Sequence, residues 1–372
     1  MVKTYSFHGS QLTGDLKFLL LIFILNVNLS LIAFSQEPDV VNQQDEGAKI
    51  EILNDQDWEL FKYEEPLRFA LSFDRKLFRK NVAKGEYQAA VLSVHLSDTI
   101  IDRDIRIRAR GISRKVICTF PPIKINLKEA DMDDTQFEHQ STLKMVTHCK
   151  GSSLYQEYIF KEYLIYKMYN LLTDFSFKVR LVQIDYIDSN QKQKPITKYG
   201  FLIEHIKDLA KRHNCIEIEN EKLSQQWMNK ESMALFGVFQ YMVANTDWSI
   251  TGLHNLKLLK SVDYTFPEPY PVPYDFDYAG FVDTDYAIPT DGLGTESVTE
   301  RVYVGKCIEE PIMYNALDQV FSKKDDIYSL INDFEYLDNK DKGFLIKYLD
   351  DFFDMMGNDK AIKRVFIDGC VK

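Results

Sequence analysis

Alternating hydrophobic and polar positions dominate the chain between residues 67 and 146, and this pattern predicts β-strands. Apolar and basic residues alternate strictly along 105–110, as expected of a strand with one buried face. Gly111 ends that strand, and Pro121 and Pro122 precede the next one. The strands predicted here are Leu67–Phe73, Gln88–Val94, Ile105–Arg110, Ile123–Leu127 and Leu143–Val146.

The period becomes helical after residue 150. Tyr155–Leu172 carries apolar and aromatic residues on most sides, which predicts a long and largely buried helix. Two more strands follow, Val179–Ile187 and Tyr199–Ile206. The later segments are mostly helical, apart from an irregular stretch at 261–290. The helices predicted there are Lys222–Asn245, Pro311–Phe321, Lys324–Leu337 and Phe344–Met356.

The order of these elements, strands with one helix first and helices later, indicates an α+β fold with two lobes. We place a β-rich N-lobe with the long helix at 61–206 and a helical C-lobe at 207–372.

The N-terminus has the layout of a secretory signal peptide. Lys3 and Lys17 precede an apolar run at 18–34, and the run ends in Ala33-Phe34-Ser35. Small residues therefore occupy the −3 and −1 positions of a cut after Ser35. The pattern predicts that 1–35 is removed and that the protein is exported to the periplasm, the cell surface or the extracellular space.

An uncleaved membrane anchor is the alternative for this segment. Asn26, Asn28 and Ser30 interrupt the apolar run, which is also short for a membrane span. We therefore expect cleavage, with no stable membrane insertion afterwards. The following residues, 36–60, are acidic and polar, and we interpret them as a tether.

Composition excludes some classes of protein. Of 372 residues, 45% are hydrophobic and 13% aromatic, which is enough to build a large core. The net charge is −11 and no long basic stripe is present, so nucleic-acid binding is not expected. The cysteines match no metal-site spacing, and their odd number leaves at least one unpaired. We expect buried thiols with no more than one bridge among Cys118, Cys149, Cys215, Cys307 and Cys370.

Two polar segments in the second half of the chain can converge on one site. Asn245–Trp248 ends a predicted helix shortly before Asn255, and a second segment covers 273–280. Phosphoryl transfer needs an Asp that orients the nucleophile, with Asn and Asp oxygens that hold Mg²⁺. Taken singly, each segment could instead be a turn with solvated acids. The candidate catalytic residue is Asp247, and the candidate metal ligands are Asn255, Asp275 and Asp277.

The ordered set of motifs resembles the CotH family of secreted and spore-coat kinase-like proteins, and more distantly the HipA-type kinases. The resemblance is spread over residues 65–290. The segments similar to family motifs are Arg110-Gly111-Ile112-Ser113, Ile123–Leu127, Gly200–Glu204, Asn245–Asp247 with Asn255, and Tyr274–Asp277. In the family they correspond to an Arg-Gly-x-Ser turn, a Lys-containing strand, a strand at the lobe junction, the catalytic loop and the metal-binding Asp segment.

The resemblance implies a two-lobed protein-kinase-like fold, with a β-rich N-lobe and a mainly helical C-lobe. It implies an exported atypical kinase that uses ATP and Mg²⁺ or Mn²⁺ to phosphorylate Ser or Thr of exported proteins. The cofactor-binding residues that it implies are Arg110, Ser113, Lys124, Lys144, Glu162 and Glu204.

The identity of the ATP-contacting lysine stays open. Lys124 lies on the strand that is similar to the family's, whereas Lys144 lies on the strand directly before the long helix, where a kinase's lysine usually sits. Its acidic partner would come from that helix, as Glu157 or Glu162.

The chain also departs from kinase patterns. Asp247 and Asn255 are eight positions apart instead of five, and Arg114 stands where the family has a second Ser. The Gly-x-Gly-x-x-Gly loop of ordinary protein kinases is absent from the sequence. A second hypothesis therefore remains: a catalytically inactive kinase-fold protein that binds a ligand or assembles a surface or coat.

Overall fold

The computed structural model describes residues 59–95, 99–128, 130–133, 135–219 and 222–372. The chain divides into two units, 1–52 and 53–372, and every described residue belongs to the second. The predicted signal peptide and nearly all of the predicted tether lie outside the described residues.

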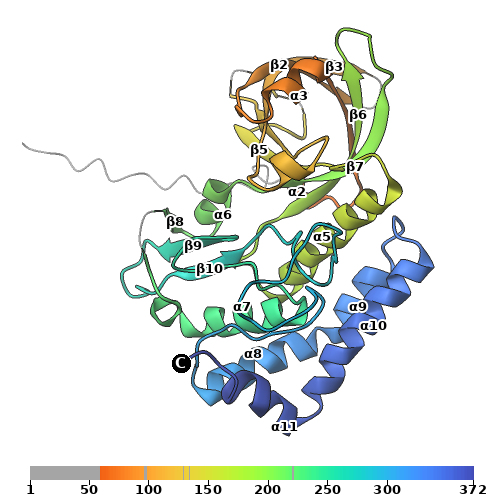
Figure 1. Cartoon of the computed structure of the whole chain (residues 1–372). Helices are drawn as coiled ribbons and strands as arrows, with labels where there is room; N and C mark the ends of the chain where they lie inside the picture. The colour runs from red at the N-terminus through yellow and green to blue at the C-terminus, as the bar shows by residue number, and fades with distance from the viewer. Residues whose placement is uncertain (1–58, 96–98, 129, 134, 220–221) are drawn as a thin grey trace, which may run out of the picture. The chain divides into compact units, whose positions relative to one another are not determined.

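Seven strands form a closed barrel (Figure 1). Their order around the barrel is β1-β2-β3-β4-β5-β7-β6, and every neighbouring pair is antiparallel except β1 and β6. The parallel β1–β6 pairing, in which Leu67 lies opposite Val182, closes the barrel. The strands are β1 (Leu67–Phe73), β2 (Gln88–His95), β3 (Ile100–Ala109), β4 (Ile123–Asn126), β5 (Thr142–Val146), β6 (Val179–Asp188) and β7 (Ile196–Ile203).

The alternation in the sequence determines which side chains fill the barrel. Ile123 and Ile125 of β4 and Leu143 and Met145 of β5 are buried in one apolar cluster with the inward residues of the other strands. The intervening lysines are only half-buried. Successive residues of a strand point to opposite faces, so the lysines lie on the outer surface of the barrel.

Helix α5 (Ser153–Leu172) packs against strands β6 and β7 of the barrel on one side and against helix α9 (Lys324–Asn332) on another (Figure 1). It is buried on most sides, as its sequence predicts, and its buried residues include the charged Glu162. Helix α7 (Lys230–Met242) packs against α8 (Glu310–Ser322) and against a second sheet. That sheet has the order β10-β9-β8. Its strands are β8 (Cys215–Ile218), β9 (Leu256–Ser261) and β10 (Tyr270–Pro273).

Further helices complete the described chain. Within the described residues, no helix is both long and apolar enough to span a membrane. These remaining helices are α2 (Glu59–Lys62), α3 (Arg75–Asn81), α4 (Arg114–Ile117), α6 (Ile206–Arg212), α10 (Asn339–Met356) and α11 (Asp359–Ile362).

Most predicted elements are confirmed, but the predicted fold is wrong. The predicted strand Leu67–Phe73 has the same bounds as β1, and the predicted long helix corresponds to α5. A two-lobed protein-kinase-like fold with a β-rich N-lobe and a mainly helical C-lobe is overturned by the closed, mixed seven-stranded barrel with its separate small sheet. The parallel β1–β6 pairing joins distant parts of the chain, and no local pattern reports it.

Two disulfides are present, which corrects the expectation of no more than one. Cys118 pairs with Cys149, and Cys307 pairs with Cys370. Cys215 is a buried free thiol, so the inference that at least one cysteine is unpaired is confirmed. The first bridge ties the end of α4 to the segment after β5.

A substitution at Gly200 tests how closely the strands of the barrel wall pack. A Cβ on this residue would overlap the carbonyl oxygen of Val146 on the neighbouring strand and lie 3.2 Å from Ile184 Cδ1. We expect Gly200→Ala to lower the free energy of unfolding by about 1–3 kcal/mol in urea denaturation. Gly151→Ala is the control, because its Cβ would meet nothing within 4 Å. Equal losses in the two variants would contradict this account.

Candidate functional site

Asp247 lies in the loop that follows α7, where hydrogen bonds fix its carboxylate. Asn255 donates from Nδ2 to Asp247 Oδ2 at 2.8 Å and to the Asp247 carbonyl oxygen at 2.8 Å. Nε2 of His254 lies 3.0 Å from Asp247 Oδ1, and the backbone N–H of Asp247 donates to Asn245 Oδ1. The structure therefore brings the predicted site residues Asp247 and Asn255 into direct contact. Because the amide nitrogen of Asn255 is engaged, its Oδ1 is the atom left for a ligand.

The β9–β10 pairing brings Asp275 beside Asn255. Leu256 lies opposite Pro273, and the Tyr274 N–H donates to the Asn255 carbonyl oxygen at 3.0 Å, which continues the ladder by one step. Asn255 and Asp275 both have positive φ, 52° and 64°. Left-handed backbone at residues other than Gly is uncommon, and such strain concentrates at functional sites.

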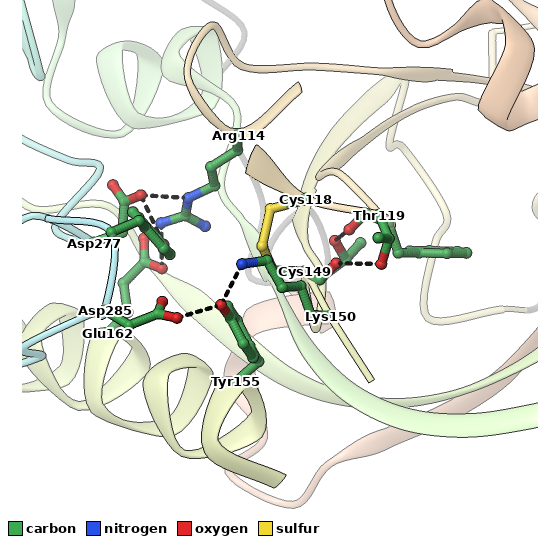
Figure 2. Close-up of a disulfide and its surroundings, with 12 residues drawn as sticks. Arg114, Cys118, Thr119, Cys149, Lys150, Tyr155, Glu162, Asp277 and Asp285 are labelled. Atoms are coloured by element: carbon green, nitrogen blue, oxygen red, sulfur yellow. Dashed lines mark hydrogen bonds and ion pairs between the residues drawn. A yellow bond between two sulfur atoms is a disulfide. The ribbon is translucent and has the colours of Figure 1, made fainter. Parts of the chain in front are cut away.

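Asp277 belongs to a buried ion-pair cluster, shown in Figure 2. Arg114 donates from Nε to Asp277 Oδ2 at 2.7 Å and from a terminal nitrogen to Glu162 Oε2 at 2.7 Å. The same nitrogen lies 3.7 Å from Asp275 Oδ1. Tyr286 also donates to Asp277 Oδ2, at 3.0 Å. Segments far apart in the chain therefore meet at one guanidinium.

The electrostatics of the cluster follow from its burial. Burial alone would lower the pKa of Arg114, but the carboxylates of Asp277 and Glu162 raise it well above its usual value. Burial raises the pKa of Glu162 to about 7, although Arg114 opposes the shift. Loss of surrounding water, followed by the charge of Asp277, also raises the pKa of Asp275.

Basic side chains also act on Asp275. Lys124 and Lys144 are direct cross-strand partners on the outer face of β4 and β5. Burial, with the charges of Arg110 and Lys257, lowers the pKa of Lys144 to about 8. Arg110 and Lys144 both lower the pKa of Asp275, which means that they lie close enough to act on it. The Lys144 ammonium also lies 5.0 Å from the centre of the Tyr274 ring.

The remaining predicted residues have other surroundings. Glu204 is buried and binds Arg212 through both oxygens, at 3.1 and 2.9 Å, so it belongs to a separate ion pair. Ser113 is the exposed N-cap residue of α4 and makes no side-chain capping bond. Of the two acids offered as a lysine partner, Glu162 lies in the cluster. The charges that act on Glu157 come instead from Asp341 and from Lys161 on its own helix. The partner of Glu162 is Arg114 and not a lysine.

We tested whether these residues suit a divalent cation. Asp275 keeps about a third of its side chain exposed, and within the part of the chain that the structure describes its carboxylate accepts no hydrogen bond. Together with Asn255 Oδ1 it provides the hard oxygen donors that Mg²⁺ prefers. One oxygen of Asp277, in contrast, is already engaged by Arg114 and Tyr286. Across the described ranges, no group of three or more His, Cys, Asp or Glu side chains is arranged to hold a metal. Asn255 and Asp275 therefore fit a metal ion better than Asp277 does.

Sequence reasoning missed the central role of Arg114 and the contribution of Tyr286. Arg114 was visible only as a departure from the family's second Ser, one residue after Ser113. Tyr286 lies in the irregular stretch, where no periodic signal exists to reveal it.

Comparison with known proteins adds no relative. A scan of protein-family models finds no match to the chain, and a search of curated proteins finds none either.

The raised pKa of Glu162 predicts a pH-dependent stability. Between 4.5, the ordinary pKa, and about 7 the folded state holds a proton that the unfolded state has lost. The free energy of unfolding should therefore fall as the pH rises through this window, by about 1.4 kcal/mol per unit of pKa difference. Glu162→Gln cannot take up the proton, so it should flatten this part of the curve.

Urea denaturation across the window measures the slope, with Glu310→Gln on the exposed surface of α8 as the control. A slope unchanged by Glu162→Gln would show that the buried cluster does not hold this proton.

Proposed function

We propose that the protein is an exported phosphotransferase that binds ATP with Mg²⁺ or Mn²⁺ and transfers the γ-phosphoryl group to a hydroxyl acceptor. The observation that carries the proposal is the hydrogen-bonded pair Asp247–Asn255 beside Asp275, with basic side chains close enough to Asp275 to lower its pKa. The proposal depends on these residues and not on a kinase-like fold.

Asp247 has the position and partners of a group that orients an acceptor hydroxyl. Asn255 and His254 hold its two carboxylate oxygens from two sides, so the carboxylate has a fixed direction. A bound divalent cation would neutralise charge that develops on the phosphoryl oxygens. Asn255 Oδ1 and the Asp275 carboxylate are the residues that would hold it.

Lys144 and Arg110 would bind the phosphates of the nucleotide. Like charges directly opposite each other in a sheet are unfavourable, as for Lys124 and Lys144, and an anion bound between them offsets the repulsion. With a pKa of about 8, Lys144 is still mainly charged near neutral pH.

Space for an acceptor exists near Asp247. The loop at 288–295 lines a pocket of about 610 Å³, and Thr290 Oγ1 of this loop lies 2.8 Å from Thr246 Oγ1, next to Asp247. That the acceptor is Ser or Thr of an exported protein comes from the resemblance to the CotH family. Two disulfides support export, since such bonds persist in oxidising compartments.

The pairing of Asp277 with Arg114 favours a second candidate, a nucleotide-binding protein without turnover. One oxygen of Asp277 is taken by Arg114 and Tyr286, so the metal site has fewer free ligands than the sequence suggested. Such a protein would bind ATP with the metal but transfer no phosphate.

Two variants separate these candidates. Asp247→Asn should lower turnover about 10²–10⁴-fold and leave ATP·Mn²⁺ affinity nearly unchanged, because orientation of the acceptor matters in the transition state. Asn255→Ala should weaken ATP·Mn²⁺ binding, because it removes a ligand oxygen.

The measurements are transfer of the γ-phosphoryl group from ATP to a Ser-rich acceptor and calorimetric ATP·Mn²⁺ binding. The control is Asp318→Asn on the exposed side of α8. Binding without transfer in the wild type would support the second candidate. Absence of ATP·Mn²⁺ binding in the wild type would exclude both candidate functions.

The two lysines should differ in their effect on nucleotide binding. Lys144 acts on Asp275 and lies over Tyr274, so Lys144→Met should weaken ATP·Mn²⁺ binding about tenfold or more. Lys124→Met should have a smaller effect, because Lys124 stands one strand further from Asp275. The same calorimetric titration compares the two variants, and a larger loss for Lys124→Met would reverse the assignment.

A further inference from the structure

Arg114 has no part in the phosphotransfer roles assigned above, yet it contacts more carboxylates than any of those residues. Its guanidinium lies 2.7 Å from Asp277, 2.7 Å from Glu162 and 3.7 Å from Asp275. Arginine does not lose its proton in proteins, so this positive charge is permanent. A centre surrounded by carboxylates is also the environment that a divalent cation requires.

The local structure holds Arg114 at this place by two anchors. It is the only buried residue of helix α4, in which Val116 is 88% exposed and Ile117 is partly buried against the core. One anchor is the ion-pair cluster itself. The other is the Cys118–Cys149 disulfide, one helical turn further, where the Cys118 N–H donates to the Arg114 carbonyl oxygen at 3.0 Å (Figure 2).

The charges show how many metal ions the site can hold. Above the pKa of Glu162, three ionised carboxylates and one guanidinium leave a net charge of −2, which one divalent cation neutralises and two would exceed. Glu162 Oε1 is buried and has no hydrogen-bond partner. The other oxygen of this carboxylate, Glu162 Oε2, and Asp277 Oδ2 both accept from the guanidinium, so the two carboxylates face the position that it fills.

We infer that Arg114 is a built-in cation that takes the place of a protein-bound metal ion, so that the site holds one divalent cation at Asn255 and Asp275. Removal of the arginine would then create a second metal site at Glu162 and Asp277. The inference rests on the proposed function only for the first cation, since the second site depends on the Arg114 contacts alone.

Mn²⁺ alone is the probe, counted by electron paramagnetic resonance of the free ion. Arg114→Met should bind one more Mn²⁺ per chain than the wild type, and its thermal midpoint should rise with Mn²⁺ concentration. Arg114→Lys keeps the positive charge and should bind the same number of Mn²⁺ ions as the wild type. Lys115→Met, on the same helix, makes the same change in net charge outside the cluster and should gain none. Near-ultraviolet circular dichroism reports whether each variant is folded.

A folded Arg114→Met variant that gains no Mn²⁺ overturns the inference, as does an equal gain in Lys115→Met. If Arg114→Met does not fold, Glu162→Gln tests instead whether Glu162 pairs with the arginine or binds the metal ion. Glu162 faces the arginine and not the metal, so this variant should keep its ATP·Mn²⁺ affinity within about twofold, and a tenfold loss would make Glu162 a metal ligand.

The results also separate this inference from the proposed function. If the wild type binds no Mn²⁺ even with ATP and Arg114→Met gains one ion, the inference is supported and the proposed function is wrong. If the wild type binds ATP·Mn²⁺ and Arg114→Met binds no additional Mn²⁺, only the inference about Arg114 is wrong.

Discussion

The ion pairs that Arg114 makes with Glu162 and Asp277 connect three parts of the protein. Arg114 follows the barrel strand β3, Glu162 lies on helix α5, and Asp277 follows strand β10 of the small sheet. All three side chains are buried. Removing one partner of a buried pair leaves an uncompensated charge and typically costs about 3–5 kcal/mol, so the position of each segment depends on the other two. The orientation of Asp275, two residues from Asp277, depends on the same contacts.

The backbone around the site is strained and is held in place by packing. Positive φ occurs at Ala244, Leu253, Asn255 and Asp275, all in segments that adjoin Asp247. Such conformations persist where the surroundings over-determine them. The Asp275 N–H bonded to the buried Tyr166 hydroxyl at 2.8 Å is one such restraint, and it comes from the long helix α5. The helix that supports the barrel therefore also shapes the site.

The sequence predicted what is local and missed what is distant. Alternation located β1 and helical periodicity located α5, because each pattern is contained in one segment. Closure of the barrel depends on Leu67 lying opposite Val182, and no segment contains that information. Asp247 and Asn255 were predicted together because they are close in sequence. The ion pairs of Arg114 join residues separated by 48 and 163 positions, and neither disulfide could be paired from spacing.

The acidic and basic groups of the site are complementary in charge but do not neutralise each other fully. Lys124 and Lys144 face each other across two strands of a protein whose net charge is −11, and burial already lowers the pKa of Lys144. Adjacent lysines that only stabilised the barrel would be expected to pair with some of the many carboxylates. Asp275 is near enough to influence Lys144, but it also lies beside Asp277 and Arg114, so it cannot neutralise the lysines fully. Under the proposed function, a polyphosphate with a divalent cation would satisfy both sides at once, because its oxygens would accept from the lysines and its metal ion would bind the carboxylate. This complementarity ties the outer face of the barrel to the loops of the small sheet.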